Sequence, residues 1–126
     1  MKKLFIIYLL LFSNLSADDY KLEKIIKGLD SPWSLTFLNS QNLLVTEKPG
    51  NIKFVNLKEK IIKDIRHNLK VLEDGQGGLL DILYNDSTVF VSYSENRLKG
   101  MSSTSVARAK LNLEKLDFNM EILKAA

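Results

Sequence analysis

A short glycine-rich segment contains the residues of this chain best suited to bind a ligand. In Asp74-Gly75-Gln76-Gly77-Gly78 one amide side chain lies between glycines, directly before an apolar run that starts at Leu79. Glycine accepts positive φ and lets the backbone come close to a bound molecule. The Gln76 amide offers one acceptor oxygen and two donor hydrogens. The segment predicts a tight turn that presents Gln76 to a polar ligand; the alternative is a glycine-rich turn with no ligand.

Four other residues have side chains that suggest chemistry, and each has a simpler interpretation. Asp74 and Asp81 flank the turn, but calcium needs six to eight oxygen ligands, so we expect them to cap the turn and solvate a strand. His67, the only histidine, is expected in a surface linker rather than as a base. Trp33 could stack on a sugar, but its place in an alternating segment favours the core. We therefore assign no catalytic or metal-binding residue.

The N-terminus resembles an export signal. Lys2 and Lys3 precede an apolar run at residues 4–12, and small or polar residues follow at 13–17. This order is typical of a secretory signal peptide, and the run is too short for a transmembrane helix, which needs about 20 residues. We expect residues 1–17 to be removed, and the mature protein to be periplasmic or secreted without stable membrane insertion.

The charge and cysteine content exclude several classes of protein. Removal of residues 1–17 takes away two lysines and no acidic residue, so 18 basic and 15 acidic residues become 16 and 15. A nearly balanced surface lacks the basic face that nucleic-acid binding requires. The chain has no cysteine, which excludes disulfides and thiolate chemistry.

The remainder of the chain is predicted to be all-β. Short segments rich in alternating or β-branched apolar residues are separated by turn residues such as Pro32, Pro49-Gly50-Asn51 and Asn85-Asp86-Ser87, a pattern typical of strands. Residues 111–115 have some helical propensity. The predicted strands are residues 20–27, 33–38, 43–47, 52–55, 61–65, 79–84, 89–95, 104–111 and 118–123.

The strands fall into two similar groups. Leu43–Glu47 holds the same place in the first group as Val89–Glu95 in the second, and Glu47 and Glu95 are 48 positions apart. Repeats of about 40–50 residues with four strands each are typical of propeller blades, although an ordinary β-sandwich is the alternative. Because blades stack in rings of about 4–8, two blades predict the front part of a longer protein.

Five segments, in order, resemble the pyrroloquinoline-quinone (PQQ)-dependent sugar dehydrogenases of the glucose/sorbosone dehydrogenase family, including the periplasmic aldose sugar dehydrogenases. They are Gly28–Leu38, Leu43–Gly50, Asp74–Asp81, Val91–Glu95 and Thr104–Ala109.

The resemblance implies a six-bladed β-propeller, of which residues 18–126 would form the N-terminal two blades. It implies PQQ and Ca²⁺ as cofactors, and an aldose and an electron acceptor as partners. The reaction would pass hydride from the anomeric carbon to the quinone. Gln76 matches the glutamine that lines the family's cofactor and substrate pocket.

Other parts of the family pattern are missing. Its histidine base, the basic residues that clamp the quinone and the calcium ligands belong to segments beyond Ala126, so this chain alone is expected to be inactive. Lys48 stands where an arginine is common, and residues 84–87 form a shorter loop. The alternative function is a non-catalytic exported propeller that binds carbohydrate or protein.

Overall fold

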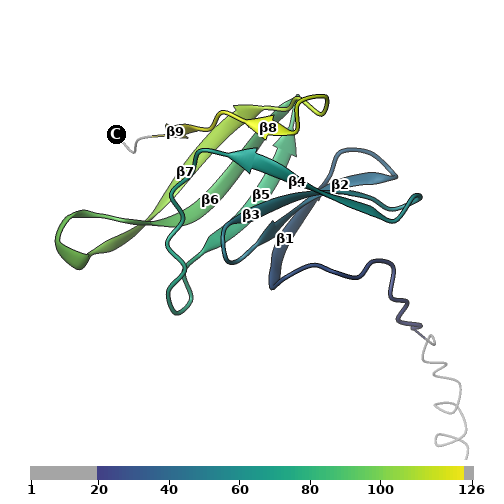
Figure 1. The fold of residues 1–126 in the computed structure, drawn as a ribbon, viewed down its shortest axis with the longest axis horizontal. Helices are drawn as coiled ribbons and strands as arrows, with labels where there is room; N and C mark the ends of the chain where they lie inside the picture. The colour runs from purple at the N-terminus through teal and green to yellow at the C-terminus, as the bar shows by residue number, and fades with distance from the viewer. Residues whose placement is uncertain (1–19, 124–126) are drawn as a thin grey trace, which may run out of the picture.

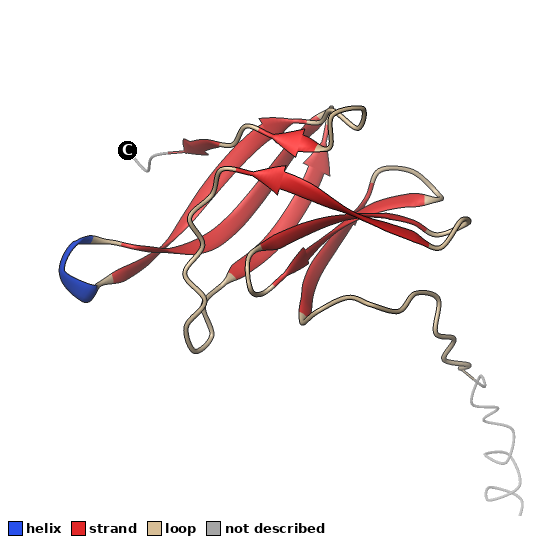
Figure 2. Cartoon of the chain, in the orientation of Figure 1, coloured by secondary structure: helices blue, strands red, loops and turns tan. Residues whose placement is uncertain are grey.

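The described part of the chain is built from β-strands. The computed structural model describes residues 20–123, so the predicted signal peptide at residues 1–17 lies outside the described residues. Within them the chain forms nine strands in two sheets and a single 3₁₀ turn at Leu98–Gly100 (Figures 1 and 2). The prediction of an all-β protein is confirmed.

The first sheet is an antiparallel meander of four strands. Its order is β1 (Pro32–Phe37), β2 (Asn42–Glu47), β3 (Asn51–Asn56) and β4 (Ile61–His67). The two-residue strand β8 (Asp117–Phe118) adds to the end of β4 in parallel. This late segment therefore extends the edge of the earlier sheet and ties the two sheets together.

The second sheet repeats the meander. Its order is β5 (Leu79–Asn85), β6 (Thr88–Asn96), β7 (Ser102–Lys110) and β9 (Glu121–Leu123). Strands β2 and β6 occupy the second position of their sheets, as the 48-residue offset predicted. Seven predicted strands, from 33–38 to 104–111, are present with bounds shifted by one or two residues.

Two strand predictions are wrong. Residues 20–27 form no strand; Leu22 is fully exposed, and of these residues only Ile26 packs against the apolar cluster of Leu43, Val45 and Val55. Residues 118–123 do not form one strand, because Asn68 engages the backbone between β8 and β9. The Met120 amide donates to Asn68 Oδ1 at 2.7 Å, and Asn68 Nδ2 donates to the Met120 carbonyl at 3.1 Å.

One apolar core lies between the two sheets. Leu44, Ile52 and Ile65 of the first sheet belong to it. Burial of large side chains in one contiguous core supplies most of the stabilising free energy of such a pair of sheets. The second sheet and the segment after it contribute Leu79, Ile82, Val89, Val91, Tyr93, Ala107, Ala109, Phe118 and Met120.

Hydroxyl groups join the sheets where β1 lies beside β5 (Figure 1). The Tyr84 amide donates to Thr36 Oγ1 at 3.1 Å, and Thr46 Oγ1 donates to the Leu80 carbonyl at 2.6 Å. Thr36 of β1 and Thr46 of β2 thus face the second sheet, where they satisfy backbone groups of β5, a strand with which neither β1 nor β2 forms a ladder.

The apolar positions of β1 consequently face outward. Trp33, Leu35 and Phe37 are 49%, 53% and 56% exposed, so the prediction that Trp33 belongs to the core is wrong for the described residues. The alternation of apolar and polar residues predicted which side chains of β1 share a face, but not which of the two faces the second sheet covers. These side chains border a groove of about 540 Å³ that continues over Leu43 and Val45.

The second sheet also has an apolar outer face, on the side away from the first. Its half-exposed apolar side chains include Leu83 and Val106; Ile122 pairs with Ala107 and therefore lies on the core side of the edge strand β9. The stack of two sheets therefore ends in two apolar surfaces of different composition.

The two faces of the first sheet should respond differently to truncation. Leu44→Ala, in the shared core, is expected to lower the free energy of unfolding by about 2–5 kcal/mol because it leaves a cavity. Leu35→Ala is the control and should cost less than about 1 kcal/mol, since half of Leu35 is already in solvent. Urea unfolding followed by circular dichroism measures both; equal losses would contradict the assignment of the core.

Candidate functional site

The predicted glycine turn connects the two sheets. It follows β4 and ends where β5 begins, and the Gly77 amide closes it by donating to the Asp74 carbonyl at 2.7 Å. Gln76 is exposed at its tip, so the amide side chain is open to solvent. The predicted tight turn that presents Gln76 is present; the ligand assigned to Gln76 remains a prediction.

Both sheets hold this turn in place. From the first sheet, the Lys48 carbonyl accepts from the Leu79 amide at 3.0 Å, and Lys48 Nζ donates to the Gly75 carbonyl at 2.7 Å. From the second, the Ser94 amide donates to the Gly78 carbonyl at 2.8 Å. The turn is therefore fixed at its beginning and its end.

The glycines are needed for two different reasons. Gly75 has φ +53°, as predicted, and a Cβ there would meet nothing within 4 Å, so that side of the turn is open. At Gly78 a Cβ would lie 2.4 Å from the Lys48 carbonyl oxygen. Positive φ was also expected at Gly77, which does not have it; a Cβ there would lie 2.9 Å from Ser94 Oγ, so Gly77 provides space.

The two aspartates beside the turn do not form a metal site. Asp74 is exposed and its carbonyl closes the turn. Asp81 does more than the predicted solvation, because Ser34 Oγ donates to its Oδ1 across the sheet boundary. In residues 20–123 no group of three histidine or acidic side chains is arranged to hold a metal ion.

Both ring nitrogens of His67 are hydrogen-bonded to backbone groups away from the turn. It was predicted in a linker but is the last residue of β4, where the Leu69 amide donates to Nδ1 at 3.3 Å. Because Nδ1 accepts, Nε2 carries the proton and donates to the Gly50 carbonyl at 2.7 Å. Neither ring nitrogen is left to act as a base.

A polar cluster near the end of β6 was not predicted from the sequence. The Glu95 side chain is only 17% exposed, and Arg97 Nη2 lies 2.8 Å from its Oε1. Buried Ser105 donates to the same oxygen at 2.6 Å, and Tyr93 donates to Oε2 at 3.3 Å. The detectable signal was the two-residue spacing from Tyr93 to Glu95, which puts both on one face of a strand.

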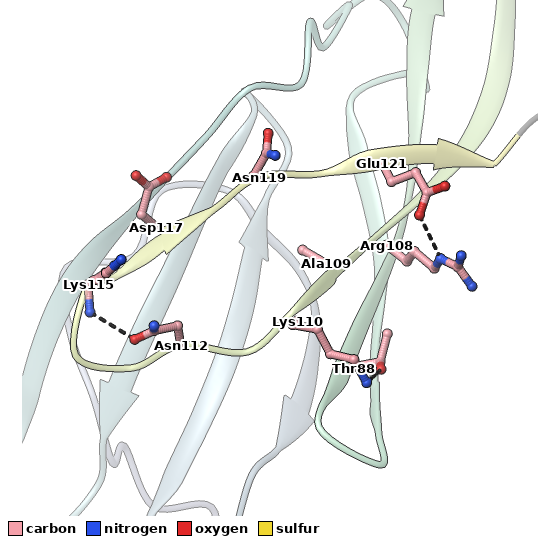
Figure 3. Close-up of a pocket in the computed structure, with 9 residues that line it drawn as sticks. All are labelled: Thr88, Arg108, Ala109, Lys110, Asn112, Lys115, Asp117, Asn119 and Glu121. Atoms are coloured by element: carbon pink, nitrogen blue, oxygen red, sulfur yellow. Dashed lines mark hydrogen bonds and ion pairs between the residues drawn. The ribbon is translucent and has the colours of Figure 1, made fainter.

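A wide polar cavity lies at the other end of the second sheet and is separate from the turn. Its volume is about 750 Å³. In this cavity Arg108 and Lys110 have partners (Figure 3): Arg108 Nε lies 3.0 Å from Glu121 Oε2, and Lys110 Nζ donates to Thr88 Oγ1 at 3.0 Å. Thr88 pairs with Asn85 at the far end of β5 from Leu79, so this cavity cannot share a ligand with Gln76.

None of the helical structure within residues 20–123 has the length and apolar character that a membrane crossing requires.

The Glu95 cluster should make stability sensitive to alkali. Burial, reinforced by the Glu95 carboxylate and opposed by Arg97, raises the pKa of Tyr93 above its ordinary value of 10.0. The neutral phenol is thus favoured in the folded state, and its contribution is complete below about pH 10 and is lost as pH rises through the folded pKa.

We expect wild-type protein to lose more stability between about pH 9 and pH 11 than Tyr93→Phe, by about 1 kcal/mol or less. Chemical unfolding at a series of pH values measures this. The hydrogen bond to Asp64 raises the pKa of Lys53, so the contribution of Lys53 to stability also declines over this pH range. Because that decline is the same in both proteins, it cancels in the comparison. Parallel curves for the two proteins would contradict the prediction.

Comparison with known proteins agrees with this architecture. The sequence profile of the glucose/sorbosone dehydrogenase family matches residues 29–126. An uncharacterized protein of Synechocystis is 30% identical over 111 residues, covering 78% of this chain and 27% of that protein.

Solved structures of sugar dehydrogenases superpose on the chain. A crystal structure of glucose dehydrogenase is 30% identical with a TM-score of 0.73, covering 79% of this chain and 31% of that one. The soluble aldose sugar dehydrogenase of Escherichia coli, in its apo form, is 25% identical with the same TM-score, covering 81% and 31%. The PQQ-bound aldose sugar dehydrogenase of Streptomyces coelicolor, 22% identical with a TM-score of 0.67, covers 80% and 32% and shares the fold.

The chain spans about a third of the length of these structures. The family profile covers most of the chain, and the two sheets and their connecting turn lie within the matched residues. The chain belongs to the glucose/sorbosone dehydrogenase family.

Proposed function

We propose that this chain is the N-terminal part of a PQQ-dependent dehydrogenase that oxidises aldose sugars at the anomeric carbon. Residues 1–17 are its signal peptide, residues 18–126 belong to its propeller domain, and the protein works in the periplasm or after secretion. The observation that carries the proposal is Gln76, exposed on a turn that hydrogen bonds fix to both sheets. Family membership gives that turn its chemical context.

The arrangement of the sheets supports a propeller. Two four-stranded meanders pack face to face with their first strands, β1 and β5, side by side. This is how neighbouring blades meet around a central axis. The chain matches 31% of the glucose dehydrogenase structure, which is close to two blades of six.

The donors around the turn fit one edge of a quinone ligand. Gln76 can donate and accept, and the open side of Gly75 leaves room for a flat molecule. The Lys48 ammonium donates to the Gly75 carbonyl and keeps its charge and two further donor hydrogens. The oxygen ligands of calcium are not present at the turn, and we derive no step through calcium from these residues.

When bound, PQQ supplies the hydride acceptor. The role of this chain is binding and orientation: the Gln76 amide, on a turn fixed from both sheets, would hold a polar edge of the cofactor or of the sugar. The proton of the anomeric hydroxyl needs a base from elsewhere in the protein, because both ring nitrogens of His67 have partners.

The alternative is a propeller that binds carbohydrate or protein without catalysis. The engagement of both ring nitrogens of His67 by backbone groups is compatible with it. The two functions differ in one requirement, since binding alone needs neither PQQ nor an electron acceptor.

Truncation of Gln76 tests the proposed role. Gln76→Ala is expected to lower kcat/KM for aldoses about tenfold or more, because a hydrogen bond to a charged or strongly polar partner contributes about 1.5–3 kcal/mol. The assay is aldose-dependent dye reduction by the protein from the complete reading frame, loaded with PQQ and calcium. Gln41→Ala is the matched control, since Gln41 is the only other glutamine in the sequence. It is exposed directly before β2, at the end of that strand away from Lys48 and the turn.

The outcomes separate the two candidate functions. Activity in wild type and Gln41→Ala with loss in Gln76→Ala supports the proposal. Sugar binding by calorimetry without dye reduction would instead establish the non-catalytic propeller. Equal activity in all three proteins would refute the role of Gln76.

A further inference from the structure

We infer that Lys48 is the positioning residue that fixes the Gln76 turn, and thereby sets the direction in which the Gln76 amide points. Lys48 directly follows β2 of the first sheet, whereas Gln76 lies just before β5, the first strand of the second sheet. The inference rests on the proposed function only where it extends to PQQ binding.

Two groups of Lys48 hold opposite ends of the turn. Its ammonium donates to the carbonyl of Gly75, the residue before Gln76, at 2.7 Å. Its carbonyl accepts from the amide of Leu79, the first residue of β5, at 3.0 Å. A charged donor makes a stronger hydrogen bond than a neutral one, so the ammonium contact is the stronger of the two.

The close contact at Gly78 prevents the turn from sliding. A Cβ at Gly78 would lie 2.4 Å from the Lys48 carbonyl oxygen and 2.8 Å from Lys48 Cγ. The backbone of the turn therefore lies directly against the Lys48 residue, both main chain and side chain. The Lys48 stem fills the space beneath the turn while its ammonium reaches Gly75.

Hydrogen bonds also hold the backbone around Lys48 in place. Its amide donates to the Ser31 carbonyl at 3.0 Å. The neighbouring Glu47 carboxylate is 1% exposed and accepts from the Asp30 amide at 2.7 Å and from Asn51 Nδ2 at 3.0 Å, with Lys53 Nζ 3.6 Å away. A buried carboxylate with these partners has few alternative positions, so the segment that presents Lys48 is rigid.

Lys48→Met removes the ammonium and keeps an unbranched stem. We expect the Gly77 amide, which closes the turn, to exchange with deuterium about tenfold faster, because the charge-assisted hydrogen bond that holds the turn against the first sheet is lost. Hydrogen exchange with mass spectrometry on a peptide that covers residues 73–79 measures this. Lys48→Arg should restore slow exchange, since a guanidinium also donates to a carbonyl.

Lys58→Met is the matched control. Lys58 is exposed in the turn between β3 and β4, and its loss should leave exchange at residues 73–79 unchanged. The thermal midpoint should be nearly the same in all four proteins. If Lys48→Met instead speeds exchange throughout both sheets and lowers the midpoint, Lys48 has a general structural role and the inference is overturned.

PQQ binding provides a second readout, separate from turnover. In a fluorescence titration of the protein from the complete reading frame with PQQ, Lys48→Met should raise the Kd about tenfold, and Lys48→Arg should restore it. If wild-type protein binds no PQQ while exchange responds as expected, the proposed function fails and the positioning role stands. Unchanged exchange in Lys48→Met overturns the positioning role, whatever the titration shows.

Discussion

Packing of the two sheets against each other is the constraint on which the rest of the structure depends. Each sheet offers one apolar face to a shared core, and a four-stranded meander with no such partner would leave that face in water. Once the core forms, β1 must lie beside β5, although no backbone ladder joins these two strands. The hydroxyls of Thr36 and Thr46 provide the missing partners for backbone groups of β5.

The same packing builds the candidate site. The connection from β4 to β5 must cross from one sheet to the next, and the crossing brings its glycine turn against Lys48. No ordinary residue fits at Gly78, where backbone meets backbone. Gln76 is thus held by contacts from outside its own segment, which is the usual way in which a rigid scaffold orients a residue on a loop.

Local features of the sequence predicted most strands, the turn and the exposure of Gln76, because alternation and glycine placement are properties of neighbouring residues. Properties that depend on distant residues were not predictable. The position of Trp33 required knowing which face of β1 the second sheet covers, and the role of Lys48 required knowing that β2 ends beside residue 75. Residues 20–27 alternate weakly, but a strand needs a neighbour, and none is adjacent. The Glu95 cluster depended on Ser105 from the next strand.

The unlike outer faces of the stack have a consequence for symmetry. One carries Trp33, Leu35 and Phe37, the other Leu83 and Val106, so a contact between one face and the other is head to tail and not two-fold. When sheets are added head to tail, the rotation between successive sheets decides whether such a series closes or continues as an open helix. The angle between the two sheets, to which the Lys48–Leu79, Thr36–Tyr84 and Thr46–Leu80 contacts all contribute, is thus a local quantity with a global result.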